Sequence, residues 1–455
     1  MGTGSAQRVP VVLSGTRSGP GGVSGHGRVL ASARGVHVLA KPTGPICNLD
    51  CSYCYFLAKE SLYPGARFRM ADELLDTYVR QLMELHAGQP AVTVAWQGGE
   101  PTLMGVEFFR RAVALAGRYA EPGQKVRHII QTNGTLLTDE WCTMLAKHGF
   151  LVGISIDGPP ELHDRYRRDK RGRPTSAKVR RGLQLLRDHG VERNVLCTVH
   201  AGNQHHPLEV YRYFRDELGE RFVQFIPIVE SATVPGEGEE GRVTERSVDP
   251  VAWGRFLVAV FDEWVRRDVG EVFVQYFDAA LASWAGLEPG LCIFAETCGA
   301  ALALIHNGDL YSCDHFVDPD HLLGNITTAH MAYLALSDRQ RAFGLAKRDT
   351  LPRRCVECPV LFACRGECPK NRTSPTPDGE AGLNYLCEGY LAFFTHINGP
   401  MRLMTDLVRR GRPASDVMTV FARAGRNEPC PCGSGRKGKL CHQRPPTAGT
   451  SAAVG

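Results

Sequence analysis

The chain of 455 residues has no apolar run long enough to span a bilayer, and it has no strong excess of either charge. Its formal net charge of +5 is too small to indicate a nucleic-acid partner. Residues 1–35 lack the apolar core and the cleavage site of a secretory signal, so we expect a disordered tail there. These absences predict a globular cytoplasmic protein that binds neither a membrane nor nucleic acid.

Cysteine, in contrast, is abundant, with 16 in the chain. Most of them fall in tight groups with the spacings CxxxCxxC, CxxC and CxC, whereas Cys142 and Cys197 stand alone and are expected to be buried core thiols. Disulfide bonds in a secreted protein are the alternative explanation. Without a secretory signal, however, tight groups of cysteine predict metal ligation in a reducing compartment.

Strand and helix patterns alternate from residue 36 to residue 265. Six units of a strand followed by a helix imply parallel strands joined by right-handed crossovers. Six units are too few for a closed barrel of eight, and the barrel rule places the chemistry at the carboxyl ends of the strands. The expected strands are residues 36–40, 91–96, 126–131, 151–156, 194–199 and 222–229.

The first cysteine group, Cys47, Cys51 and Cys54, can place three thiolates around one small volume. A [4Fe-4S] cluster held by three thiolates keeps one iron free to bind a cofactor. A zinc knuckle that lacks a ligand, or scattered thiols, would be the alternatives. With the aromatic Tyr53 before the third cysteine, the motif resembles the radical S-adenosylmethionine (SAM) superfamily. That resemblance implies an open, partial (β/α)6 barrel that binds SAM.

The same resemblance implies which residues contact SAM. The turn Trp96-Gln97-Gly98-Gly99-Glu100-Pro101 resembles the motif that holds the amino group of SAM, and its glycines let a ligand approach the backbone. Arg167 lies in a basic run, so a solvated surface charge is the alternative for this residue. The residues that the resemblance assigns to SAM are Tyr53, Gly99, Ser155, Arg167 and Val229.

A second cysteine field supplies eight further thiolates, enough for two fully ligated [4Fe-4S] clusters or, alternatively, for two structural zinc sites. The pattern CxxC-x5-CxxxC followed by a distant cysteine resembles the SPASM domain. In that family the fourth of the closely spaced cysteines ligates the first cluster. The resemblance therefore assigns auxiliary cluster I to Cys292, Cys298, Cys313 and Cys368, and auxiliary cluster II to Cys355, Cys358, Cys364 and Cys387.

Four local sequences resemble the anaerobic sulfatase-maturating enzymes, and the resemblance extends from about residue 36 to residue 394: ICNLDC, WQGGEPTL, QTNGTL and NGDLYSCD. It implies oxidation of a Cys or Ser in a Cys/Ser-x-Pro-x-Arg segment of a sulfatase to Cα-formylglycine. A 5′-deoxyadenosyl radical would take one hydrogen, and an external donor such as flavodoxin or ferredoxin would supply electrons. Asp314 matches the base of the family, although it could be an ordinary turn residue, and Asp278 is a weaker candidate.

Near the C-terminus, Cys430, Cys432, Cys441 and His442 resemble the SEC-C zinc motif, which suggests a bound zinc ion and protein docking. A disordered basic tail is the alternative. Together the patterns predict this organisation: a tail at 1–35, a radical SAM partial barrel at 36–235, an insertion and bridging helix at 236–285, a SPASM domain at 286–395, a helix and linker at 396–425, a SEC-C-like motif at 426–444 and a disordered tail at 445–455.

Two other functions compete with sulfatase maturation. A radical SAM and SPASM enzyme that forms a thioether or another crosslink in a ribosomally made peptide would share the same clusters. A zinc-binding scaffold without turnover would use the cysteines for zinc alone.

Overall fold

A computed structural model describes residues 35–232 and 243–443. The tails expected at residues 1–35 and 445–455 fall outside these ranges except for Gly35, and so do residues 236–242 at the start of the predicted insertion. Within the two described ranges, no helix combines the length and the apolar character needed to cross a membrane.

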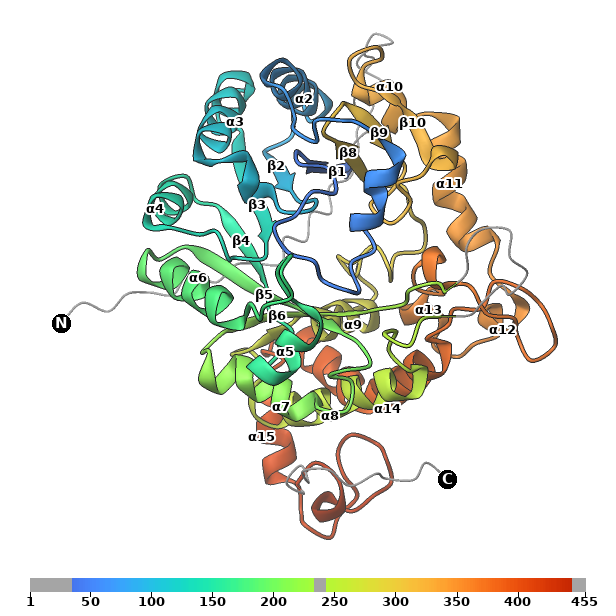
Figure 1. Ribbon diagram of the computed structural model, residues 1–455. Helices are drawn as coiled ribbons and strands as arrows, with labels where there is room; N and C mark the ends of the chain where they lie inside the picture. Colours follow the sequence, from blue (N-terminus) through green and yellow to red (C-terminus); the bar gives the residue numbers. More distant parts are fainter. Residues whose placement is uncertain (1–34, 233–242, 444–455) are drawn as a thin grey trace.

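A single sheet of ten strands forms the centre of the described structure, in the order β10-β9-β8-β1-β2-β3-β4-β5-β6-β7 (Figure 1). Strands β1 to β7 run parallel to their neighbours, and β8 pairs in parallel with the free edge of β1. The parallel strands are β1 (His37–Lys41), β2 (Ala91–Trp96), β3 (Lys125–Thr132), β4 (Leu151–Ser155), β5 (Glu192–Val199), β6 (Phe222–Pro227) and β7 (Phe273–Val274).

Helices follow the six predicted strands and surround the sheet, which confirms the predicted α/β partial barrel (Figure 1). Their apolar faces recur every three or four residues; in α2, for example, Leu75, Val79 and Leu82 are buried. The helices of this part are α2 (Asp72–Leu85), α3 (Val106–Tyr119), α4 (Asp139–Lys147), α5 (Pro160–Tyr166), α6 (Ser176–Asp188), α7 (Pro207–Arg212), α8 (Pro250–Arg267) and α9 (Gln275–Ala285).

The cysteine-rich segment contributes strands to the same sheet, which the sequence did not predict. Strand β8 (Ala301–Ile305) runs beside β1 from the pair His37 and Ala301 to the pair Lys41 and Ile305. Strands β9 (Asp309–Tyr311) and β10 (Leu322–Asn325) add antiparallel neighbours. The helices of this segment are α10 (Met331–Ala335), α11 (Asp338–Asp349), α12 (Arg353–Val356) and α13 (Leu361–Cys364).

The long helix α14 (Cys387–Arg409) packs against α8 and closes the core. It begins at Cys387 within the predicted SPASM domain and continues into the predicted helix and linker at residues 396–425. The end of that predicted helix and linker contains a further helix, α15 (Asp416–Arg423), which buries Val417 and Phe421.

The crossing of α8 and α14 depends on glycine. A Cβ atom at position 389 would lie 2.1 Å from the carbonyl oxygen of Pro250, which is far inside van der Waals contact. A Cβ atom at position 117 in α3, in contrast, would meet no atom of the described structure within 4 Å. Gly389 and Gly117 therefore suit a comparison. Both lie in helices, but only position 389 lacks room for a Cβ atom.

We expect Gly389→Ala to lower the free energy of unfolding by about 1–3 kcal/mol through overpacking. Gly117→Ala should instead raise it by about 0.5–1 kcal/mol, because alanine favours the helix. Anaerobic denaturant titrations of the two variants test this expectation. Equal effects of the two substitutions would contradict the close helix crossing.

Candidate active site and metal centres

The loop that carries Cys47, Cys51 and Cys54 follows β1 and lies against the turn after β2. The amide of Gly99 donates to the carbonyl of Gly44 at 2.8 Å, and the amide of Glu100 donates to the carbonyl of Ile46 at 2.9 Å. A Cβ atom at position 99 would lie 2.0 Å from the carbonyl oxygen of Ile46. Glycine is therefore required at position 99 for the cysteine loop to lie this close.

A fully buried carboxylate, Glu100, joins this turn to the loop after β3. It accepts hydrogen bonds from the amide and hydroxyl of Thr102 at 3.0 and 2.6 Å, from the hydroxyl of Thr132 at 2.7 Å and from the amide of Asn133 at 2.8 Å. Burial raises the pKa of Glu100, against the effect of these hydrogen bonds. Glu100 thus fixes the relative position of two loops at the carboxyl end of the sheet.

The loop after β3 also contacts the cysteines. The side-chain amide of Asn133 donates to Asn48 Oδ1 at 2.9 Å and lies 3.6 Å from the sulfur of Cys47. Burial raises the pKa of Cys47 to about 12 and that of Cys51 to about 11. A metal binds cysteine as the thiolate, and the positive charge of a bound metal offsets the effect of burial on the pKa. The three buried cysteines therefore suit a metal or cluster.

Arg167 and Tyr53 form one buried network. The guanidinium Nη1 of Arg167 donates to the hydroxyl oxygen of Tyr53 at 2.8 Å, and that hydroxyl donates to Asp157 Oδ2 at 2.5 Å. Burial favours protonation of Asp157, but the Arg167 guanidinium prevails and holds its pKa below the usual range. Arg167 is only 6% exposed, so it is not a solvated surface charge, and its Nε has no hydrogen-bond partner among the described residues.

Ser155 and Val229 lie at the same end of the sheet. Ser155 is the last residue of β4, and its hydroxyl accepts a hydrogen bond from Gln131 Nε2 at 3.0 Å. Val229 follows β6 and is buried. The five predicted SAM contacts therefore all lie at or after the carboxyl ends of parallel strands.

Asp314 follows β9 and is held by two residues that the sequence did not single out. Its carboxylate forms an ion pair with the ammonium of Lys41, the last residue of β1, and accepts a hydrogen bond from the hydroxyl of Tyr55 at 2.9 Å. Burial alone would raise the pKa of Asp314, but the Lys41 ammonium keeps it below its usual value. The contact with Lys41 thus favours the ionised form of Asp314 beside the cysteine loop.

The second candidate base has different surroundings. Asp278 lies in the first turn of α9, is half-buried, and burial raises its pKa to about 7. In the described part of the chain, no hydrogen bond or ion pair involves its carboxyl group. The contacts with Lys41 and Tyr55 therefore distinguish Asp314 from Asp278.

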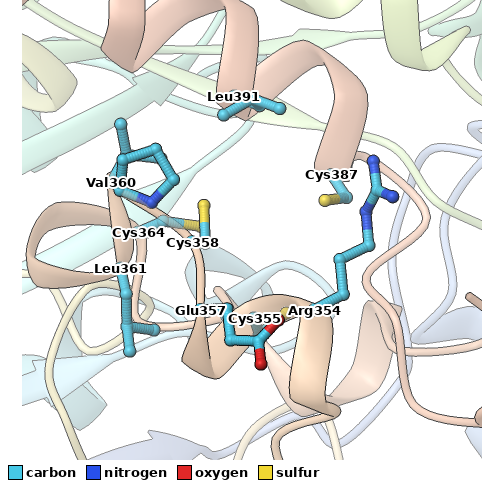
Figure 2. A pocket seen from close by; sticks show the side chains of 11 residues that line it. Arg354, Cys355, Glu357, Cys358, Val360, Leu361, Cys364, Cys387 and Leu391 are labelled. Carbon is cyan, nitrogen blue, oxygen red and sulfur yellow. The ribbon is translucent and has the colours of Figure 1, made fainter.

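The four cysteines predicted for auxiliary cluster II line one cavity of about 220 Å³ (Figure 2). Cys355 lies in α12, Cys364 ends α13 and Cys387 begins α14, so three helices bring their thiols to the cavity. The side chain of Arg354 also lines it, beside Cys387 (Figure 2). A hollow surrounded by four thiols fits a cluster with four cysteine ligands.

The four cysteines predicted for auxiliary cluster I also lie close enough to interact. The thiol of Cys313 is affected electrostatically by Cys292 and Cys298, and the thiol of Cys368 by Cys298 and Cys313. Burial raises the pKa of Cys313 to about 12. Cys368, the last cysteine of the CxxC-x5-CxxxC pattern, therefore lies near the three cysteines that precede this pattern in the sequence.

The C-terminal donors Cys430, Cys432, Cys441 and His442 form a compact group, called the knuckle here. Their ligand atoms all lie within 4.8 Å of one another, with Cys432 and Cys441 sulfurs 3.6 Å apart. A zinc ion with bonds of about 2.3 Å to sulfur and about 2.0–2.1 Å to nitrogen fits such a group. The alternative of a disordered basic tail is therefore wrong for residues 426–443.

The knuckle packs on the helices instead of extending away from them. A Cβ atom at position 399 of α14 would lie 1.7 Å from the carbonyl oxygen of Cys432. Arg266 of α8 donates from Nε to the carbonyl of His442 at 3.1 Å, and the ring of His442 stacks on Phe421 of α15 at 4.1 Å. Three helices thus support the four donors.

Comparisons with known proteins agree with this arrangement. Residues 42–213 match the radical SAM superfamily, residues 292–359 an iron-sulfur cluster-binding domain and residues 426–444 the SEC-C motif. The chain is 45% identical over 394 residues to the serine-type anaerobic sulfatase-maturating enzyme of Bacteroides thetaiotaomicron, covering 84% of this chain and 94% of that one.

Two further relatives show the same family. The cysteine-type anaerobic sulfatase-maturating enzyme of Clostridium perfringens is 32% identical over 365 residues, covering 79% of this chain and 95% of that one. A solved structure described as native anSMEcpe with bound AdoMet and Cp18Cys peptide superimposes with a TM-score of 0.72 at 31% identity, covering 82% of this chain and 99% of that one.

The parallel sheet, the cysteine loop after its first strand and the cysteine-rich segment define a radical SAM enzyme with a SPASM domain. Within that class, the chain belongs to the anaerobic sulfatase-maturating enzymes. The knuckle adds a SEC-C motif to this framework.

We expect the protein to bind one zinc ion at the knuckle, and Cys441→Ser to remove it because one of the four ligands is lost. Elemental analysis of the purified protein should show zinc in the unaltered chain and in the Cys142→Ser control, and little zinc in Cys441→Ser. The iron content should be the same in all three proteins. Zinc that persists in Cys441→Ser would place the ion elsewhere.

Proposed function

We propose that this protein oxidises a Cys or Ser residue of a sulfatase to Cα-formylglycine. The observation that supports this function best is the contact of the Asp314 carboxyl group with Lys41 and Tyr55 beside the cysteine loop. A carboxylate at this place can accept the proton of a substrate thiol or hydroxyl. Family membership supports the same reaction, because the relatives are named for sulfatase maturation.

We also propose that Cys47, Cys51 and Cys54 hold a [4Fe-4S] cluster with an open iron and that SAM binds there. The contacts to SAM would come from Tyr53, Gly99, Ser155, Arg167 and Val229. In support, these residues lie at or beyond the carboxyl ends of the strands. The Nε of the buried Arg167 has no partner among the described residues and is available to the carboxylate of SAM. Cluster and SAM together would supply the 5′-deoxyadenosyl radical that removes hydrogen from the substrate carbon.

The chain's own residues would position the substrate and manage its proton. Asp314 would accept the proton from the substrate thiol or hydroxyl, Lys41 would keep the carboxylate ionised, and Tyr55 would orient it. The eight cysteines of the SPASM segment would hold two auxiliary [4Fe-4S] clusters, and the cavity lined by four of them supports this assignment.

The partner in this proposal is a sulfatase with a Cys/Ser-x-Pro-x-Arg segment, and a related structure contains a bound peptide. Flavodoxin or ferredoxin would supply electrons in the cytoplasm, where thiols stay reduced. The Bacteroides thetaiotaomicron relative is serine-type and shares more identity than the cysteine-type relative does, so a serine substrate is the first to test.

The deciding experiment is anaerobic incubation of the reconstituted protein with SAM, reductant and a peptide that contains Ser-x-Pro-x-Arg or Cys-x-Pro-x-Arg. Mass spectrometry should show loss of two hydrogen atoms from Ser, or an aldehyde in place of the Cys side chain. A thioether or other crosslink would support the competing peptide-maturase function. Absence of iron and of SAM cleavage would support the zinc scaffold.

We expect Cys51→Ala to abolish cleavage of SAM, because the first cluster would lose one of only three protein ligands. Chromatographic detection of 5′-deoxyadenosine measures this loss. Cys142→Ala removes a buried thiol far in sequence from every group and should retain cleavage. Normal cleavage by Cys51→Ala would show that the cluster lies elsewhere.

We expect Asp314→Ala still to form 5′-deoxyadenosine. Its aldehyde yield should fall by a factor of about 100 or more, which is the usual effect of losing a general base. Lys41→Met should reduce the aldehyde yield in the same direction, because burial without the ammonium favours a protonated Asp314. Asp318→Ala, which removes the cap of a short helical turn and the contact of Asp318 with the ring of His321, is the control. An undiminished aldehyde yield in Asp314→Ala would exclude Asp314 as the base.

A further inference from the structure

The turn between Cys364 and Cys368 has an unusual backbone. Its three residues, Arg365, Gly366 and Glu367, all have positive φ angles of 51°, 70° and 50°. The left-handed region is unfavourable for each residue that carries a Cβ atom. The surrounding structure must therefore hold the turn in this conformation.

The guanidinium group of Arg372 holds this turn in place through hydrogen bonds. Nε donates to the carbonyl of Gly366 at 3.0 Å, Nη2 to the carbonyl of Arg365 at 3.2 Å and Nη1 to the carbonyl of Lys347 at 2.7 Å. A Cβ atom at position 366 would lie 2.6 Å from Nη2, so the approach requires glycine. One planar group thus fixes the turn to the end of α11.

A second cation extends this connection to the loop that contains Cys292. The ammonium of Lys347, which is only 1% exposed, donates to the carbonyls of Cys292, Ile293 and Ala295 at 2.8, 2.7 and 2.6 Å. Arg372 and Lys347 therefore join two segments that carry cysteines of both predicted auxiliary clusters.

Neither cation forms an ion pair with a carboxylate of residues 35–232 and 243–443. The buried carboxylate of the turn, Glu367, accepts hydrogen bonds from Asn371 at 3.0 Å and Asn384 at 2.7 Å, not from either cation. Glu367 still lies near enough to Lys347 for the two charges to interact electrostatically. Arg372 is half-buried and has no ion pair in the described ranges, so a bound anionic cluster would give its guanidinium a counter-charge.

The cysteines around Arg372 belong to both predicted clusters. Its guanidinium interacts electrostatically with the thiols of Cys355 and Cys364, assigned to cluster II, and with those of Cys298 and Cys368, assigned to cluster I. The interactions of Lys347, in contrast, are with Cys292, Cys298 and Cys368, all assigned to cluster I. Arg372 thus lies between the two sites, and Lys347 lies at one of them.

We infer that Arg372 is a positioning residue shared by the two auxiliary clusters: it fixes the turn that links their ligands and supplies one positive charge to both. The inference rests on the proposed function for the presence of the clusters. A nearby cation stabilises the more negative, reduced form of a cluster, so it raises the midpoint potential. Loss of Arg372 should therefore lower the potentials of both auxiliary clusters.

The test is an anaerobic redox titration of the reconstituted full-length protein, followed by electron paramagnetic resonance. In Arg372→Gln we expect both auxiliary potentials to shift to more negative values, and in Arg372→Lys a smaller shift in the same direction. Lys347→Gln should shift the potential of cluster I alone and so identifies its signal. Arg348→Gln, a substitution of an exposed arginine on α11, should leave both potentials unchanged.

An unchanged potential for either auxiliary cluster in Arg372→Gln, relative to Arg348→Gln, would overturn the inference. If Arg372→Gln cannot retain auxiliary iron, the same criterion applies to Arg372→Lys, which keeps a cation at this position. These potentials do not depend on aldehyde formation. A protein with three clusters that makes no formylglycine would refute the proposed function and leave the inference standing, whereas auxiliary sites without iron would refute both.

Discussion

The pairing of β1 with β8 is the constraint on which the candidate site depends. Five consecutive backbone pairs, from His37 and Ala301 to Lys41 and Ile305, fix the cysteine-rich segment beside the first strand of the barrel. Because both strands run in the same direction, their carboxyl ends lie at one edge of the sheet. Lys41 therefore meets Asp314, although the two residues lie far apart in the sequence.

Much of the fold could be predicted from the sequence because the barrel strands and helices have strong periodicity. The strands at Ala91–Trp96 and Leu151–Ser155 are apolar runs between turn signals, and the helices after them have apolar faces. Strands β8 to β10 were missed because they are short and lie among loops. Helix α11 was missed because it is mostly polar and buries few side chains, among them Gln340 and Lys347.

Some residues of the candidate site could likewise be predicted from the sequence, and others could not. Cysteine spacing marks a metal site locally, so the three groups were evident before the fold was known. Lys41 and Tyr55 could not be identified, because their contacts with Asp314 depend on strand pairing across the chain. A polar residue directly after a predicted strand was the available signal for Lys41. The sequence indicates Glu100 only as part of a glycine-rich turn, whereas its carboxylate joins two loops.

The close contact between Gly399 and the carbonyl of Cys432 makes the C-terminal knuckle part of the folded body. Helix α14 has 23 residues, so it is roughly 35 Å long, with Cys387 at its start and Gly399 near its middle. One helix therefore contacts two different candidate metal sites. A chain that ends before residue 426 would expose the surface of α14 around Gly399. It would also expose the face of α15 on which His442 stacks.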